Sequence, residues 1–164
     1  NANNIDATLI SFLRYRPGLL YDFNAESYAF PTPRSWSFVD KRLKLPTVNE
    51  DRLFYGVSSL VGDGPAGEYM AFRQICTSLP DIDELIANPG TYKKDENPAV
   101  LYALTGALAA RACEEKIDNI VKVINKLPTE FQVVGIKSSL GVDKTLLKHA
   151  AISSWISKNS NVIL

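Results

Sequence analysis

The sequence predicts an all-α protein. Apolar residues return every three or four positions along most of the chain, which is the period of one helix face, and the β-branched residues follow the same spacing. Leu-Pro recurs at Leu45-Pro46, Leu79-Pro80 and Leu127-Pro128, and each pair separates two apolar segments, as expected where proline ends a helix. With 164 residues, 46% of them hydrophobic, the chain can form one domain or two small ones, each with a core.

The first helix is expected over residues 4–15. Ile5, Leu9 and Leu13 follow helical spacing there, and Arg16-Pro17-Gly18 ends the pattern. A short helical turn over 19–23 and a loop as far as Pro33 are expected to follow.

The next helix is predicted to begin at Thr32. The threonine hydroxyl can cap the first turn, and Pro33 fits that turn because its missing N–H has no intrahelical use there. Trp36, Val39 and Leu43 then place one apolar stripe on this helix, and basic residues near its end agree with the helix dipole.

Arg34 is the one misplaced charge on this helix. It falls in the first turn, where the dipole is positive and a cation is unfavourable. A guanidinium beside unpaired backbone N–H groups fits a site that grips an anion, and phosphate suits both groups. The alternative is an ordinary surface arginine paired with a nearby carboxylate such as Asp40 or Glu26.

Leu53, Val57 and Val61 predict another helix, a turn is expected over 62–67, and a helix is expected to follow over 69–76. The turn matches the Gly-x-Gly-x-x-Gly pattern of dinucleotide-binding proteins. No strand is expected before it and no βαβ unit after it, so a connection between two helices is the preferred interpretation.

The second half of the chain continues the helical pattern. Asp81 is expected to cap a short helix ending near Asn88, and residues 92–97 form a polar loop. Asn97-Pro98 should start a long helix reaching about Cys113. Its small residues would let another helix approach closely, which makes it the candidate central buried helix; they are Ala103, Gly106, Ala107 and Ala110.

Three further segments complete the prediction. Helices are expected over 115–127 and 129–140, the latter with a capping box between Thr129 and Gln132, and 143–159 closes the chain. Trp36 and Trp155 are interpreted as core anchors.

The region from residue 5 to residue 45 contains several runs that match one protein family: Phe12-Leu13-Arg14-Tyr15-Arg16-Pro17, Leu19-Leu20, Phe23 and Phe30-Pro31-Thr32-Pro33-Arg34-Ser35-Trp36. Through these runs the region resembles the helical lid of AAA+ ATPases, most closely the MoxR-like branch in bacterial and phage ATP-binding proteins. The resemblance continues more weakly near Val61-Gly62 and over 68–72, 101–111 and 127–132. The resemblance implies that Arg34 is the sensor-2 arginine, which reaches the nucleotide phosphates, and that Thr32 and Pro33 lie on the ATP phosphate side.

The chain departs from that family in lacking a P-loop. Such a loop needs Gly-x-x-x-x-Gly-Lys-Ser/Thr, whereas Gly135-Ile136-Lys137-Ser138 separates its glycine from its lysine and has no upstream glycine. No hydrophobic strand ending in Asp-Glu is present to hold magnesium. The expectation is therefore a C-terminal piece of a larger ATPase, with ATP and Mg²⁺ bound in the intact protein and no cofactor bound by this piece alone.

Composition argues against several other function classes. The chain has 18 basic and 18 acidic residues, without the basic excess of a nucleic-acid-binding surface. Its longest apolar run, residues 99–110, is too short to span a bilayer, so a cytoplasmic protein is expected. Cys76, Cys113 and His149 are too few and too scattered for a zinc motif, and the cysteines are expected to be buried free thiols.

Other candidate groups have simpler interpretations. A cation site at Asp81, Asp83 and Glu84 is possible, but helix capping and solvation explain these acids more simply. These acids, Asp81, Asp83 and Glu84, are therefore not expected to form a metal site. Arg14 and Arg16 could contact phosphate or a neighbouring subunit, or pair with Asp22 or Glu26.

The sequence leads to two alternatives of different classes. In the first, residues 3–45 are a lid with the sensor-2 motif and 46–164 are a helical extension that contacts neighbouring ring subunits or a client protein. The missing N-terminal AAA+ core would supply catalysis, and the piece alone would be inactive. In the second, the chain is a stand-alone α-helical adaptor that binds a protein partner and has no nucleotide role.

Overall fold

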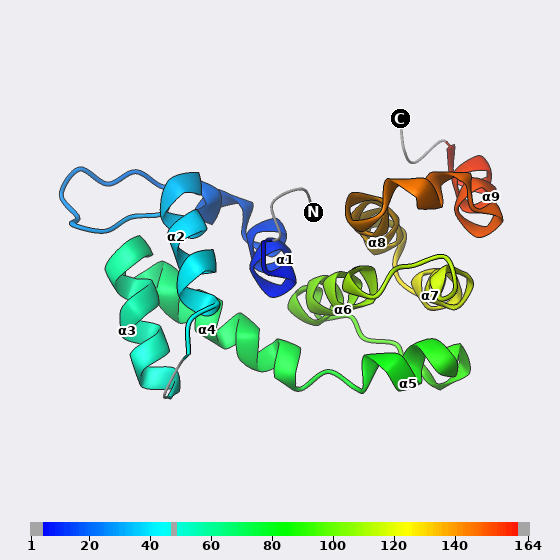
Figure 1. Ribbon diagram of the computed structural model, residues 1–164, viewed down its shortest axis with the longest axis horizontal. Helices are drawn as coiled ribbons and strands as arrows, with labels where there is room; N and C mark the ends of the chain where they lie inside the picture. Colours follow the sequence, from blue (N-terminus) through cyan, green and yellow to red (C-terminus); the bar gives the residue numbers. More distant parts are fainter. Residues whose placement is uncertain (1–4, 47–48, 161–164) are drawn as a thin grey trace. The chain divides into compact units, whose positions relative to one another are not determined.

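The computed structural model describes residues 5–46 and 49–160, and over these residues every regular element is helical. The all-α prediction is therefore confirmed. The α-helices are α1 (Ala7–Tyr15), α2 (Pro33–Leu43), α3 (Glu50–Val61), α4 (Asp63–Thr77), α5 (Ile82–Ala87), α6 (Pro98–Ala110), α7 (Ile117–Ile124), α8 (Thr129–Val142) and α9 (Ala150–Lys158), as labelled in Figure 1. Short 3-10 helices are η1 (Pro17–Leu20), η2 (Pro89–Thr91) and η3 (Lys144–Lys148).

The chain divides into two compact units, Asn3–Thr77 and the part from Ser78 onward. The expected boundary between residues 45 and 46 does not coincide with this division. Helices α2 and α3 lie on either side of residues 45 and 46 and pack against each other within the first unit. The segment that resembles the lid therefore shares its core with the two helices that follow it.

Aromatic side chains form the core of the first unit. The Phe12 ring lies 5.7 Å from Trp36 and 5.3 Å from Tyr69, both in edge contacts, and 5.7 Å from Phe72. All four side chains are buried, and Trp36 also donates its indole N–H to the carbonyl of Leu19 at 2.6 Å. The core thus joins α1, α2 and α4, and the interpretation of Trp36 as an anchor is confirmed.

The connection between α3 and α4 is much shorter than expected. The predicted turn over residues 62–67 is wrong, because α4 already begins at Asp63 and only Gly62 lies between the helices. Gly62 has a φ of 88°, a conformation that side-chain-bearing residues rarely adopt. Pro65 is tolerated in the first turn of α4 because N–H groups there have no intrahelical partner. Packing of Ala66 and Tyr69 in the core then fixes the helix.

Helix α6 is the buried centre of the second unit, as predicted. It packs against α5, α7 and α8, and its Thr105 and Gly106 are buried as well as its aliphatic residues. The predicted caps at Asp81 and Asn97 are also present. Asp81 Oδ1 accepts from the N–H groups of Asp83 and Glu84, and Asn97 Oδ1 accepts from that of Ala99.

The capping box expected at Thr129 is wrong. Pro128 occupies the N-cap position of α8 and no side chain caps the helix. Gln132 instead donates to the Leu127 carbonyl at 2.9 Å, and its Oε1 accepts from the buried Trp155 indole N–H at 3.1 Å. A tertiary contact with α9 therefore takes the side chain that the local pattern assigned to a cap. Trp155 is a core anchor, as expected.

None of the helices in the described ranges, 5–46 and 49–160, has the length and apolar character needed to cross a membrane.

Candidate functional site

The candidate site is the start of α2, where the predicted threonine cap is present. Thr32 Oγ1 accepts from the Ser35 backbone N–H at 3.0 Å, and Ser35 Oγ accepts from the Thr32 N–H at 2.8 Å. This reciprocal pair is a capping box. Ser35 Oγ also lies 3.1 Å from the carbonyl of Phe30, which holds the preceding loop against the helix start.

The cap leaves one backbone donor in the first turn. Pro33 has no N–H, the Ser35 N–H donates to the Thr32 side chain, and the Trp36 N–H donates to the Thr32 carbonyl at 3.0 Å. Only the N–H of Arg34 itself is left to meet an anion. An anion at this position would therefore be held mainly by the Arg34 guanidinium.

The Arg34 side chain is exposed. Within the described part of the chain no carboxylate lies at salt-bridge distance from it, and α2 has no acidic residue in its first turn. The guanidinium lies 5.9 Å from the centre of the Phe38 ring, one turn further along the helix. Arg34 is thus a solvent-facing cation at the positive end of a helix.

Neither of the two carboxylates predicted as possible partners, Asp40 and Glu26, pairs with Arg34. Asp40 is buried, and it accepts from the Asp6 backbone N–H at 2.8 Å and from Lys44 Nζ at 2.7 Å. Glu26 is exposed in the loop before α2 and makes no ion pair with Arg34.

Helix α3 offers an internal comparison. Arg52 is likewise an exposed arginine in a first turn, after the N-cap Asn49. Two acidic neighbours, Glu50 and Asp51, accompany it and suit the positive helix end. Arg34 has no such acidic neighbours.

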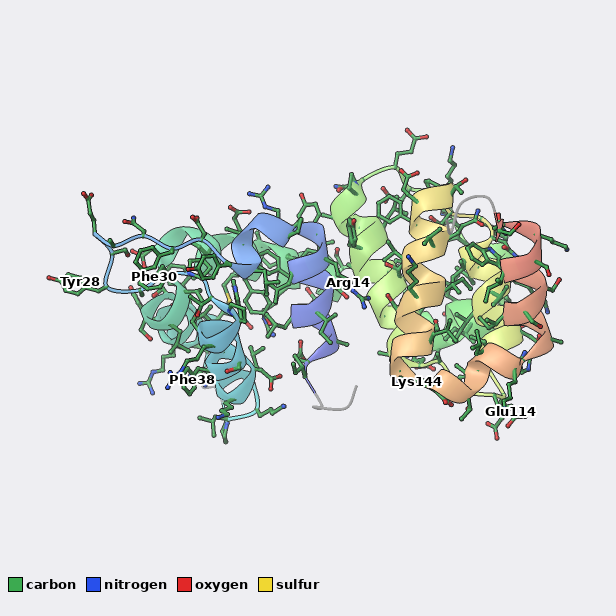
Figure 2. All side chains as sticks on the ribbon, turned by 90° about the horizontal axis from the view of Figure 1, so that it is seen from above. Arg14, Tyr28, Phe30, Phe38, Glu114 and Lys144 are labelled. Atoms are coloured by element: carbon green, nitrogen blue, oxygen red, sulfur yellow. The ribbon has the colours of Figure 1, made fainter. Side chains whose placement is uncertain are left out.

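The solvent-facing side of α2 adds a ring and a second cation. Phe38 is exposed, and Lys41 Nζ lies 5.2 Å from the centre of its ring on the next turn. Figure 2 shows Phe38 at the edge of the ribbon, away from the helices of this unit. Arg34, Phe38 and Lys41 therefore form one exposed stripe along α2.

The loop between η1 and α2 is held at its base. The Asp22 N–H donates to the Pro31 carbonyl at 3.0 Å, and the Phe23 and Phe30 rings meet edge-to-face at 5.0 Å. Figure 1 shows this loop extending beyond the helices of its unit, and Figure 2 shows Tyr28 pointing outward from it. Tyr28 is fully exposed.

The other basic residues in the segment resembling the lid have different surroundings. Arg16 pairs with Glu68 of α4, with 2.8 Å between Nε and Oε2, and not with Asp22 or Glu26. Glu68 is 52 positions away, so no local pattern indicated this pair. Arg14 lies on α1 with an exposed side chain (Figure 2).

The acidic residues at the start of α5 are explained by capping and pairing. Asp81 caps the helix, and Asp83 accepts from Arg111 Nε and Lys116 Nζ, both at 2.9 Å. These two cations hold the pKa of Asp83 below its usual value. No group of three or more His, Cys, Asp or Glu side chains able to hold a metal occurs among the described residues.

The remaining candidates have structural roles. His149 is half-buried, and its Nδ1 accepts from the Ala151 N–H at 3.3 Å at the start of α9. Cys76 and Cys113 are free thiols, but both are half-buried and not fully buried as expected. Gly135 lies inside α8, where a Cβ would come within 3.0 Å of Ile124 Cδ1. It allows close packing of α8 against α7 and forms no phosphate loop.

Comparisons with known proteins give no relative. No protein-family model, no curated protein and no solved structure matches the chain.

Proposed function

We propose that this chain is the lid and helical extension of a MoxR-like AAA+ ATPase, with Arg34 as its sensor-2 arginine. The observation that supports this most is the exposed, carboxylate-free guanidinium in the first turn of α2. The proposal places the protein in the cytoplasm. It also gives the residues after 45 the task of contacting neighbouring ring subunits or a client protein.

The position of Arg34 is energetically unfavourable as long as no anion is bound beside it. A cation at a helix N-terminus is unfavourable by a few tenths of a kcal/mol up to about 1 kcal/mol. A triphosphate brought to this end reverses the sign of that interaction, because it is attracted by both the guanidinium and the helix end. Arg34 would then report the presence of the γ-phosphate by drawing α2, and the core packed beneath it, toward the nucleotide.

The residues around Arg34 hold its helix turn in place, as a phosphate-sensing arginine would require. Ser35 and Thr32 fix the first turn through their mutual hydrogen bonds, and the buried Trp36 fixes the helix behind it. The missing core would bind ATP and Mg²⁺ and supply the phosphoryl-transfer chemistry. The contribution of this chain would be to orient one guanidinium.

The test uses the full protein that carries this chain, with Arg34→Ala compared to Arg52→Ala. We expect Arg34→Ala to lower the ATPase rate at least tenfold, which corresponds to about 1.4 kcal/mol of transition-state stabilisation. Arg52→Ala removes an exposed arginine from the first turn of the neighbouring helix and should leave the rate within about twofold. Arg34→Lys should recover only part of the activity, since an ammonium cannot form the two parallel bonds of a guanidinium. An unchanged rate for Arg34→Ala would remove this residue from the mechanism.

A second candidate function is an α-helical adaptor that binds a protein partner. The loop before α2 favours it, because Tyr21, Phe23 and Tyr28 are all more than half exposed there. Aromatic side chains held on a loop closed at its base are well suited to a protein interface. The coding sequence around this segment distinguishes the two candidates: a P-loop in the same polypeptide supports the ATPase, and a polypeptide without one supports the adaptor.

A further inference from the structure

The second unit contains a cavity of about 510 Å³ that none of the functions above uses. Four segments line it: the residues leading into α5, the middle of α5 itself, the stretch from Thr91 to Asp95, and the first half of α6. Its apolar and aromatic lining comes from Leu79, Pro80, Leu85, Tyr92, Val100 and Leu104. Leu85 and Leu104 belong to the core of the unit, so the cavity reaches that core from the surface.

The polar lining of the cavity has an excess of negative charge. Asp81, Glu84 and Asp95 line it, and Lys93 is the single basic residue among the lining residues. Asp81 and Asp95 accept backbone N–H groups, and in the described ranges none of the three acids has a cation at salt-bridge distance. Asp83 makes the contrast: it lies outside the lining, and its charge is balanced by Arg111 and Lys116.

We propose that this cavity binds a basic, apolar segment of a partner protein. One large apolar side chain of the segment, leucine or phenylalanine in size, enters the cavity and covers Leu79 and Val100. A lysine or arginine next to it in the segment meets Glu84 and Asp95. Burying an apolar side chain of this size removes its surface from water and so favours binding, and charge complementarity selects basic over acidic segments.

Other occupants fit the lining less well. A phosphate or carboxylate ligand would meet the excess of like charge. The most exposed aromatic loop of this chain itself, between η1 and α2, carries Asp22 and Glu26 and no basic residue, so a second copy would bring acid to acid. The proposal concerns binding alone, and it stands whether or not the intact protein hydrolyses ATP.

Two peptides provide the test; they share the same apolar pair and carry either basic or acidic residues on both sides of it. They are acetyl-Gly-Lys-Leu-Phe-Lys-Gly-amide and acetyl-Gly-Glu-Leu-Phe-Glu-Gly-amide, each titrated into the whole ¹⁵N-labelled chain and followed by amide chemical shifts. We expect the lysine peptide to shift the amides of Leu85, Thr91 and Val100, with an affinity that weakens as salt is raised. The glutamate peptide should bind at least tenfold more weakly.

Variants locate the binding. Glu84→Gln with Asp95→Asn should weaken the lysine peptide at least fivefold, and both changes keep the side-chain shape. Val100→Phe should fill the cavity and abolish the shifts. Glu130→Gln, an exposed acid in the first turn of α8 outside the lining, should change nothing and serves as the matched control. Equal binding of both peptides, shifts that map elsewhere, or no binding at millimolar peptide would each overturn the proposal.

Discussion

Asp40 Oδ1 accepts a hydrogen bond from the backbone N–H of Asp6, 34 positions earlier, at 2.8 Å. Asp6 in turn caps α1 by accepting from the Leu9 N–H at 2.9 Å. One buried carboxylate on α2 therefore orients the residue that starts α1, and its second oxygen accepts from Lys44. Asp40 thus joins two helices. Both of its carboxylate oxygens already accept hydrogen bonds, which explains why it does not pair with Arg34.

Asp40→Ala should destabilise the first unit by about 1–3 kcal/mol, the cost of leaving the Asp6 N–H without an acceptor. Asp40→Asn keeps a carbonyl acceptor and should cost markedly less, because the partly exposed Lys44 pair contributes little. Urea unfolding followed by circular dichroism measures both. Equal losses for the two variants would show that the charge, and not the acceptor, is what matters.

Gly62→Ala should cost about 1–3 kcal/mol, because the residue has a φ of 88° and a Cβ would come within 3.0 Å of the Ala29 carbonyl oxygen. Gly64→Ala is the matched control: it lies two residues on, inside α4, and its Cβ would meet nothing within 4 Å. That change should stabilise the chain by about 0.4–1 kcal/mol. Thermal unfolding of the two variants should move in opposite directions, and a shared direction would contradict the conformational argument.

Cys76 should react slowly with iodoacetamide in the folded chain. Burial raises the pKa of its thiol from 9.0 to about 11, although the Thr8 hydroxyl opposes the rise. At pH 8 the reactive thiolate should therefore be about a hundredfold rarer than in the unfolded chain. A Cys113→Ser background isolates the reaction, and the same variant in 6 M guanidinium chloride (about the concentration that unfolds most domains) is the control.

The same pKa shift predicts a loss of stability in alkali. The folded chain holds the Cys76 proton more tightly than the unfolded chain does. The free energy of unfolding from this thiol is therefore unaffected below about pH 9 and falls as the pH rises toward about 11. Cys76→Ser should flatten this part of the pH profile. Equal labelling rates in the folded and unfolded chains would contradict the raised pKa.

Local signals in the sequence predicted much of the helical fold. Thr32, Asp81 and Asn97 cap helices as expected, because a cap depends on a few consecutive residues. The predicted turn over residues 62–67 is wrong, because that prediction considered residue types alone and not tertiary packing. Its glycines and proline are typical of turns, but α4 continues through them because Ala66 and Tyr69 are buried. Gln132 likewise has its partner on α9, which no local pattern contains.

The candidate site could be predicted only in part. The cap and the position of Arg34 in the first turn follow from adjacent residues, whereas its exposure depends on where Asp40 and Glu26 lie after folding. The Arg16 pair with Glu68 joins α1 to α4 and has no trace in local spacing. The cavity was not predicted either, because its lining is assembled from the residues before α5, α5 itself, the stretch after it and α6.

The single-residue joint at Gly62 fixes the rotational phase of α4 relative to α3. Each added residue would turn α4 by about 100° and advance it by about 1.5 Å, so one insertion would swing Tyr69 out from beneath Phe12. Natural length variation in homologues should therefore be absent from this joint.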